Sequence, residues 1–323
     1  MSQIIDGLRQ LTRQWTTRGL RPNGAERVSH QNTLDRILTL PADGRSPRQI
    51  FGSTSDAFWL WCFTEGYRED ERLRRVLPSF PADEIQCRFA GASGDDTMRD
   101  AFSFYNLVKT LVSQHRAKPL ESVLEFGCGW GRIIRWFLHD IEPDRLWGID
   151  CMPEAIELCR STNPYCRFEL VNPFPPSNVP DGTFDLIYSY SVFSHLSEDA
   201  HLAWLGEFKR VLKPGGLLIA TTRPRDFILT CAEARRSGEE RDWAQGTVLA
   251  FKDTEDALAR FDRGEYLYEP LGGGGVLDSS FFGETCIPQK YVTDRWTKLF
   301  EFIGYVDDRR LCLQNVIVVR KAA

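Results

Sequence analysis

The stretch VLEFGCGWGR, residues Val123–Arg132, places three glycines within five residues, directly after a run of strand-forming residues. The glycines are Gly127, Gly129 and Gly131, so their spacing is shorter than the G-x-G-x-x-G pattern that binds the pyrophosphate of a dinucleotide. Glu125 precedes them, and its negative charge would repel a phosphate but would suit a ligand that carries an ammonium group. The stretch therefore predicts a strand, a bare loop and a helix, with a ligand other than a dinucleotide at the loop.

Strands and helices alternate after this stretch. The strand-type segments RLWGID, CRFELV, FDLIYSYSVF and GGLLIATT are separated by the helix-type segments PEAIELCRST and EDAHLAWLGEFKRVL, and GRIIRWFLHDI is expected to be the first helix. Continuous apolar strands in such an alternation are typical of βαβ units and of a parallel sheet covered on both faces. The sequence therefore predicts an α/β, doubly wound fold, which YVTDRWTKLFEFIGYVDD and LQNVIVVRK close with a helix and two strands, the strands forming an antiparallel hairpin at the sheet edge.

Two parts of the chain depart from this alternation. Residues 1–85 hold helix-type patches and no repeated strand signal, so we expect a helical N-terminal extension ahead of a domain over residues 86–323. Residues from about 223 to 290 interrupt that domain with a charged helical stretch and the loop LGGGGVLDSSFFGETCIP. Because an irregular segment of this length usually binds a ligand, we expect a lid there.

Composition limits the classes of function. Of the 323 residues, 42% are hydrophobic and 26% are charged, and the formal net charge of -5 disfavours a nucleic-acid partner. The sequence has no targeting pattern and no apolar run of about 18 residues, so we expect a cytoplasmic protein without a membrane span. The nine cysteines are scattered and form no C-x-x-C pair, which favours reduced thiols over disulfides or a metal site. The oligomeric state stays open.

A second acid follows the next strand. Asp150 ends RLWGID and lies about 20 residues beyond Gly131, the separation expected for a carboxylate that binds ribose hydroxyls. S-adenosylmethionine carries an amine, a sulfonium and a ribose, and it has no phosphate. Two acids around a glycine loop therefore favour this cofactor.

Residues from about 91 to 320 resemble the class I S-adenosylmethionine-dependent methyltransferases, because four motifs occur in order: LEFGCGWGR, GIDCMPEAIELC, DGTFDLIYSYSVFSHL and EFKRVLKPGGLLIATT. The resemblance implies a Rossmann-like, seven-stranded, mostly parallel sheet. It also implies a set of cofactor-binding residues in the loop and at the strand ends, namely Glu125, Gly127, Cys128, Gly129, Gly131, Asp150, Cys151, Asn172 and Ser189. Asn172 stands where many members carry an adenine-binding aspartate, and it is either an adenine contact or a turn residue. Cys128 is expected to be a small buried filler rather than a nucleophile.

The sulfonium is already an activated methyl donor, so the enzyme must chiefly align an acceptor. The segment YSYSVFSHLSED follows the fourth strand and should place Tyr188, Ser189 and Tyr190 near the methyl group. His195 is the candidate base, because its ordinary pKa suits proton abstraction near neutral pH. The alternative is that His195 only caps or packs.

The segment GETCIPQKYVTDRW, together with LQNVIVVRK, resembles a bacterial subgroup thought to modify small molecules or sugars. This resemblance implies acceptor contacts from five residues of the lid, namely Asp278, Phe281, Phe282, Glu284 and Gln289. Glu284 is the second catalytic candidate, or it only folds the lid. We expect an enzyme that methylates a hydroxyl, or less readily an amine, of a sugar or small metabolite. The alternatives are a protein or peptide methyltransferase that docks its partner on the N-terminal extension, and a non-catalytic cofactor-binding subunit.

Overall fold

The computed structural model describes residues 22–38, 44–237 and 244–323. Its described residues fall into two compact units. Unit 1 comes from Met1–Val123, Cys128–Gly148 and Pro153–Glu169. Unit 2 comes from Leu124–Gly127, Ile149–Met152 and Leu170–Ala323.

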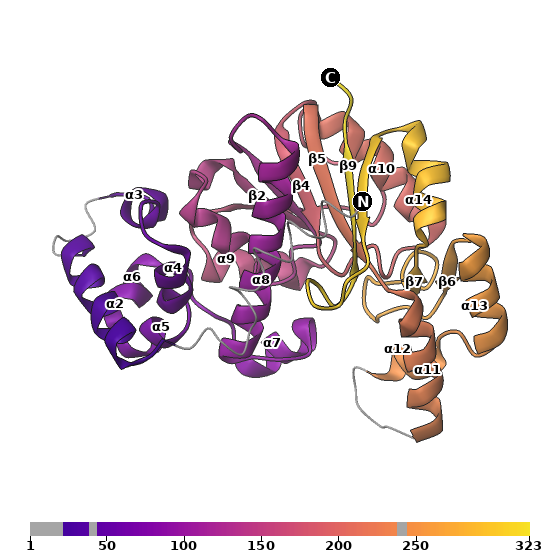
Figure 1. Ribbon diagram of the computed structural model, residues 1–323, viewed down its shortest axis with the longest axis horizontal. Coiled ribbons are helices and arrows are strands. Elements are labelled where there is room, and N and C mark those ends of the chain that lie inside the picture. Colours follow the sequence, from indigo (N-terminus) through magenta and orange to yellow (C-terminus); the bar gives the residue numbers. More distant parts are fainter. Residues whose placement is uncertain (1–21, 39–43, 238–243) are drawn as a thin grey trace. The chain divides into compact units, whose positions relative to one another are not determined.

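A seven-stranded sheet organises the fold (Figure 1). Its strands are β1 (Val123–Phe126), β2 (Leu146–Asp150), β3 (Arg167–Leu170), β4 (Phe184–Ser189), β5 (Leu212–Thr222), β8 (Glu301–Val306) and β9 (Asn315–Arg320). They are hydrogen-bonded in the order β3-β2-β1-β4-β5-β9-β8. β4 and β5 are parallel, whereas β9 is antiparallel to both β5 and β8. The predicted doubly wound, mostly parallel sheet with a C-terminal antiparallel hairpin is confirmed.

The central strands are buried along their whole length. Every residue of β1, β2 and β4 is buried, which explains why these strands read as continuous apolar runs rather than as an alternation of apolar and polar residues. The segment KPGG, residues 213–216, lies inside β5, where Gly215 has a φ angle of 75° and the pairing with β4 shifts between Phe184 and Leu186.

Helices follow the strands as predicted, with one exception. The sheet is accompanied by α9 (Pro153–Thr162), α10 (Glu198–Val211) and α14 (Gln289–Arg295) and by three short 3-10 helices, η2 (Ile134–His139), η3 (Pro143–Arg145) and η4 (Trp296–Lys298). The prediction of an α-helix over GRIIRWFLHDI was wrong in type, because η2 occupies it. In an α-helix the carbonyl of Gly131 would accept the backbone N–H of Arg135. Here it accepts Nε of the buried Arg135 side chain at 3.0 Å.

Seven helices of unit 1 lie in the described residues ahead of β1. They are α2 (Gly24–Ile37), α3 (Pro47–Phe51), α4 (Asp56–Cys62), α5 (Glu65–Glu69), α6 (Glu71–Val76), α7 (Asp83–Ala90) and α8 (Gly94–His115). The last of them is the longest of these seven, with 22 residues. No helix in the part of the chain that the structure describes is long and apolar enough to cross a membrane.

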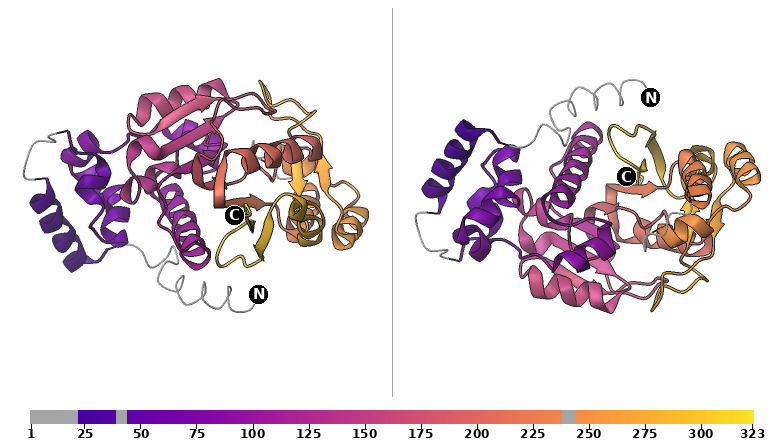
Figure 2. Two further views of the ribbon diagram at one scale, coloured as in Figure 1. Left: turned by 90° about the horizontal axis from the view of Figure 1, so that it is seen from above. Right: turned by 90° about the horizontal axis from the view of Figure 1, so that it is seen from below.

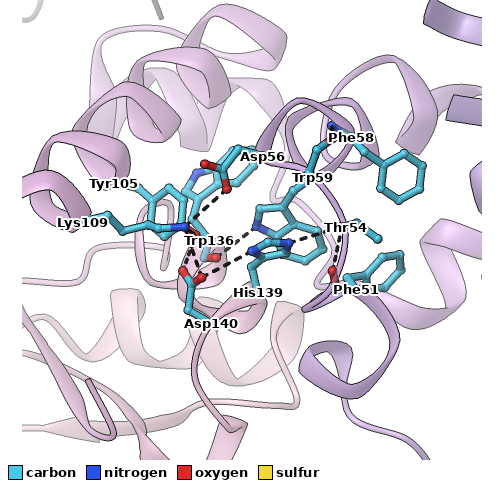
Figure 3. Close-up of polar contacts among 11 residues, drawn as sticks. Phe51, Thr54, Asp56, Phe58, Trp59, Tyr105, Lys109, Trp136, His139 and Asp140 are labelled. Carbon is cyan, nitrogen blue, oxygen red and sulfur yellow. Dashed lines mark hydrogen bonds and ion pairs between the residues drawn. The ribbon is translucent and has the colours of Figure 1, made fainter. Parts of the chain in front are cut away.

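A polar and aromatic cluster joins α4, α8 and η2 within unit 1 (Figure 3). Nζ of Lys109 lies 3.3 Å from a carboxylate oxygen of Asp56 and 3.1 Å from one of Asp140. Beside it, the fully buried Trp59 donates its indole N–H to the carbonyl of Trp136 at 3.0 Å. One cation between two carboxylates, next to a buried aromatic core, fixes α4 against the segment that follows the glycine loop.

The insertion between β5 and α14 has regular structure. It contains α11 (Arg225–Ser237), α12 (Ala244–Leu249), α13 (Thr254–Arg263), β6 (Leu267–Glu269) and β7 (Glu284–Cys286). Helices α12 and α13 pack against α11 (Figure 2), and the strands form an antiparallel pair. Its small core includes Ile228, Cys231 and Leu267, so the insertion is more ordered than an irregular loop.

The predicted extension over residues 1–85, the domain over 86–323 and the lid role of 223–290 stay predictions. Residues 1–21, 39–43 and 238–243 lie outside the described part of the chain.

Candidate active site

The glycine loop after β1 has a backbone that only glycine adopts without strain. Gly127, Gly129 and Gly131 have φ angles of 71°, 51° and 73°, in the left-handed region that penalises any side chain. Space is also excluded at Gly127, because a Cβ atom there would lie 2.2 Å from Cγ2 of Val192. Glycine is therefore required at residue 127 by the backbone angle and by the close approach of the loop that follows β4.

The ends of three neighbouring strands converge at this point of unit 2. The N–H of Gly127 donates to the carbonyl of Ile149 at 2.8 Å, one residue before β2 ends at Asp150. The carbonyl of Asp150 in turn accepts the N–H of Val171, just beyond β3, at 3.0 Å. Together with the approach of Val192 to Gly127, these contacts place the end of β1 between the ends of β2 and β4, where open parallel sheets bind their ligands.

The two predicted acids differ in their surroundings. Glu125 lies inside β1 and is 3% exposed, whereas Asp150 is the last residue of β2 and is 8% exposed. One carboxylate oxygen of Asp150 accepts the backbone N–H of Met152 at 2.9 Å, which holds the side chain at the strand end. A carboxylate side chain at this strand end is suited to binding a pair of hydroxyls.

Three further predicted cofactor residues lie near the strand ends of unit 2. Ser189 ends β4 and is fully buried, and its hydroxyl makes no hydrogen bond to the described residues. Cys151 follows Asp150, and burial, followed by the negative charge of Asp150, raises the pKa of its thiol to about 12. Asn172 is exposed, and its side chain forms no hydrogen bond within the described residues. An adenine contact by Asn172 stays a prediction.

The remaining part of the loop lies in unit 1. Cys128 is 3% exposed, and its sulfur lies 4.0 Å from the sulfur of Cys159 on α9. The Cys159 thiol contacts the carbonyl of Gly129 at 3.2 Å. Both sulfurs pack beneath the loop, an environment that favours the small neutral filler expected of Cys128.

His195, the predicted base, is fixed on two sides by Gly283. Its backbone carbonyl accepts the N–H of Gly283 at 2.7 Å, and its ring nitrogen Nδ1 lies 2.8 Å from the carbonyl of Gly283. The ring also stacks on Phe282, with centroids 4.9 Å apart and planes 9° apart. A segment 88 residues further along the chain therefore sets the orientation of the imidazole.

These contacts also determine the tautomer of His195. A carbonyl oxygen can only accept a hydrogen bond, so Nδ1 must carry the proton. In the neutral ring Nε2 then holds the lone pair, and it has no hydrogen-bond partner among the described residues. Burial lowers the pKa of His195 below the usual 6.5, Glu284 opposes this, and Arg223 adds to it. The ring is therefore neutral at pH 7 and can accept a proton at Nε2.

Glu284, the second candidate, lies next to His195 at the start of β7. Its oxygen Oε1 is 3.6 Å from Nδ1 of His195, further than the carbonyl of Gly283. Its oxygen Oε2 is 3.1 Å from Nε of Arg223. The structure thus brings the two predicted catalytic residues together, with Glu284 as an electrostatic neighbour of the ring rather than its hydrogen-bond partner.

The loop that carries His195 is braced by a polar network absent from our sequence predictions. Ser191 has a φ angle of 59°, which is unusual for a residue other than glycine. Its N–H donates to Thr221 Oγ1 at 2.8 Å, and its hydroxyl accepts Nε2 of Gln314 at 2.8 Å. Thr221 Oγ1 donates to Gln314 Oε1 at 2.7 Å and so joins the two. Such strain persists only where the surroundings hold it, and it is often found at functional sites.

The other predicted acceptor residues are dispersed. Phe282 stacks on His195, and Phe281 is buried behind it with ring centroids 6.4 Å apart. Asp278 is an exposed turn residue whose carboxylate accepts the N–H of Ser280 at 2.8 Å. Gln289 begins α14. Of these four, only Phe282 touches a catalytic candidate.

Known proteins resemble part of this chain. A family model described as a methyltransferase domain matches residues 123–216. A probable methyltransferase, ltbC, of Aspergillus luteorubrus is 29% identical over 112 residues, which cover 31% of this chain and 39% of that protein. A malonyl-[acyl-carrier protein] O-methyltransferase of Hahella chejuensis is 29% identical over 116 residues, which cover 35% of this chain and 40% of that protein. The chain thus spans about 40% of the length of these curated relatives.

Among solved structures, a SAM-dependent methyltransferase of Methanosarcina mazei is similar, with a TM-score of 0.43 and 18% identity over 66% of this chain and 97% of that one. The matched residues include the glycine loop, Asp150, Ser189 and His195. They also supply β1 to β4 and the start of β5 in the seven-stranded sheet. Residues 123–216 therefore resemble a methyltransferase domain, and they lie in a mostly parallel seven-stranded sheet of the methyltransferase fold.

Proposed function

We propose that the chain transfers the methyl group of S-adenosylmethionine to a hydroxyl group of a sugar or another small metabolite, with His195 as the general base. The methyltransferase-domain match supports the reaction class. The hydrogen bond from Nδ1 of His195 to the carbonyl of Gly283 supports a hydroxyl as the methyl acceptor. This bond leaves a neutral imidazole with a basic Nε2. A hydroxyl must lose its proton to accept a methyl group, and a neutral, partly buried histidine can take it.

The residues at the strand ends fit the methyl donor. Asp150, at the end of β2, would bind the ribose hydroxyls through its carboxylate. The left-handed glycines would let the backbone approach the cofactor closely, and Glu125 would favour its ammonium group. Ser189 supplies a buried hydroxyl that makes no hydrogen bond to other described residues. When bound, S-adenosylmethionine supplies an electrophilic methyl group.

The chain's own residues would then align and deprotonate the acceptor. Stacking on Phe282 and the two hydrogen bonds to Gly283 hold the His195 ring in one orientation. The network of Ser191, Thr221 and Gln314 holds the loop that carries it. A base that is fixed before the acceptor arrives needs no reorganisation during proton transfer. Glu284 would stabilise the imidazolium that forms, from 3.6 Å away.

The acceptor is a sugar or small metabolite in this proposal because of the resemblance of the segment GETCIPQKYVTDRW. A protein or peptide acceptor is the second possibility, since the Hahella chejuensis relative is named a malonyl-[acyl-carrier protein] O-methyltransferase. Purified protein is to be incubated with methyl-labelled S-adenosylmethionine and separate pools of sugars, small hydroxylated metabolites and protein extract. Label in the protein pool alone would overturn the small-molecule acceptor, and calorimetry showing NAD binding without S-adenosylmethionine binding would overturn the reaction class.

His195→Ala tests the base. We expect the maximal rate to fall by about 10²–10⁴-fold while the affinity for S-adenosylhomocysteine is unchanged. In the wild type the rate should be constant above the lowered pKa of His195 and should fall as the pH drops through it, because the protonated ring cannot accept a proton. The matched control is His201→Phe, since His201 is a second histidine of unit 2 that stacks on an aromatic ring, Tyr266, and it is fully buried without a hydrogen bond to the described residues. Normal saturating turnover by His195→Ala would remove the base assignment.

A further inference from the structure

Arg223 occupies a fixed position directly after β5. Its guanidinium lies 4.3 Å from the ring centroid of Phe227, which limits its motion on one side. On the other side Nε and Nη2 reach the two carboxylate oxygens of Glu284 at 3.1 and 3.5 Å. The Arg223 side chain is 23% exposed and that of Glu284 is 10% exposed, so water screens this ion pair only partly.

Arg223 and His195 compete for the same carboxylate oxygen. Oε1 of Glu284 is 3.5 Å from Nη2 of Arg223 and 3.6 Å from Nδ1 of His195. If Arg223 were removed, the carboxylate could turn towards His195 and form a direct ion pair with the protonated ring. The carbonyl of Gly283, now at 2.8 Å from Nδ1, would then lose its place as the partner that keeps the ring in its basic tautomer.

We propose that Arg223 is a positioning residue for His195, which holds Glu284 in an ion pair and so keeps the imidazole neutral and bonded to Gly283. The inference rests on the proposed role of His195 as the base. Arg223 does not touch the reacting atoms in this assignment. It acts by fixing both the direction and the charge balance of the carboxylate beside the base.

The charged groups that bear on His195 come from two elements. Glu284 belongs to β7 and Arg223 follows β5, and their opposite charges act on the ring in opposite directions. The neighbouring thiols of Cys231 on α11 and Cys286 on β7 have pKa values raised by burial, to about 12 for Cys231, so they stay uncharged. A change at Arg223 or Glu284 should therefore be read directly in the titration of His195.

The experiment follows His195 in the full-length chain by NMR. Histidine is to be isotopically labelled, and the signal of His195 among the five histidines is the one lost in His195→Gln. Arg223→Gln removes a positive charge that disfavours protonation, so the pKa of His195 should rise by about half a unit or more. Glu284→Gln removes the opposing negative charge, so the pKa should fall. Arg223→Lys keeps the charge and should shift the pKa less than Arg223→Gln does.

Arg225→Gln is the matched control. Arg225 lies two residues after Arg223 in the sequence, and its guanidinium forms an exposed ion pair with Asp262 instead of with Glu284. It should leave the His195 titration unchanged. An unchanged pKa in a folded Arg223→Gln protein would overturn the inference, and so would shifts of equal sign in Arg223→Gln and Glu284→Gln. If Arg223→Gln does not fold, Glu284→Gln must still lower the pKa of His195 and Arg223→Lys must leave it close to the wild-type value, and failure of either expectation would overturn the inference.

The pH dependence of turnover separates this inference from the proposed function. If both hold, the acidic limb of the rate profile moves with the NMR pKa, to higher pH in Arg223→Gln and to lower pH in Glu284→Gln. If the NMR pKa moves and the acidic limb of the rate profile does not, His195 is not the base. The proposed hydroxyl acceptor then loses the observation that supports it. If neither moves, the positioning role of Arg223 is wrong while His195→Ala still tests the base independently.

Discussion

Gly127→Ala is the substitution for which the structure gives the most definite expectation. The left-handed φ angle of 71° costs an alanine about 1–2 kcal/mol. The new Cβ would also lie 2.2 Å from Cγ2 of Val192, a separation that forces the valine or the loop to move. Overpacking of this kind costs about 1–3 kcal/mol, and valine relieves it poorly because its side chain is stiff at χ1. The smaller unfolded-state entropy of alanine offsets about 0.4–1 kcal/mol.

These values predict that the free energy of unfolding falls by about 1–5 kcal/mol. Urea unfolding, followed by fluorescence of the nine tryptophans, gives the measurement. Gly182→Ala is the matched control, because Gly182 has a φ angle of 58° and open space where its Cβ would be. Gly182→Ala should lose only the free energy that the left-handed φ angle costs an alanine. In the double variant Gly127→Ala, Val192→Ala the free energy lost to overpacking should be recovered. The free energy lost to the left-handed φ angle should remain lost.

The same variants test the ligand. Calorimetric titration with S-adenosylhomocysteine should show weaker binding by Gly127→Ala and unchanged binding by Gly182→Ala, since only Gly127 lies at the point where the strand ends converge. Equal losses of stability in the two variants would mean that the contact between Gly127 and Val192 does not exist. Wild-type affinity in a folded Gly127→Ala protein would mean that this loop does not bind the cofactor.

Three other substitutions have defined outcomes. Asp150→Ala should weaken binding of S-adenosylhomocysteine tenfold to a hundredfold in calorimetry, with an unchanged circular dichroism spectrum, because it removes a charge-assisted hydrogen bond of about 1.5–3 kcal/mol. Gly283→Ala should slow turnover but leave cofactor affinity intact, because its Cβ would lie 1.9 Å from the carbonyl of Glu269 and would displace the partner of His195. Arg99→Met should lower the free energy of unfolding by about 3–5 kcal/mol in urea, because it leaves Glu65 buried without the cation 2.6 Å away.

The sheet was predictable from the sequence because its strands are buried on both faces. A run such as FDLIYS has the composition of a central parallel strand, and β4 is buried at every position. The 3-10 helix η2 was not predictable in the same way. Its form depends on the Arg135 side chain taking the carbonyl of Gly131, and a tertiary hydrogen bond of this kind leaves no periodic signal in the sequence.

The residues of the candidate site also differ in how far the sequence alone could predict them. The glycine loop and Asp150 follow strands directly, so their positions could be inferred from strand ends alone. The role of Gly283 could not, because it depends on a pairing between segments 88 residues apart. Arg223 also lacks a local signal, since an arginine after a strand most often faces solvent. The pairing of Arg223 with Glu284 is visible only once β7 is placed beside the end of β5.

Two glycines act on opposite ends of one short loop in unit 2. Gly127 makes room for Val192, and Gly283 bonds both the backbone and the ring of His195, three residues later. The N–H of His195 donates to the carbonyl of Val192 at 2.8 Å, so the two ends of the loop form a single turn. A displacement of Val192 by Gly127→Ala should therefore reach the base, and the losses of turnover in Gly127→Ala and Gly283→Ala should not add in the double variant. Additive losses would mean that the glycine loop and the base are held independently, with the turn between them too flexible to transmit a shift.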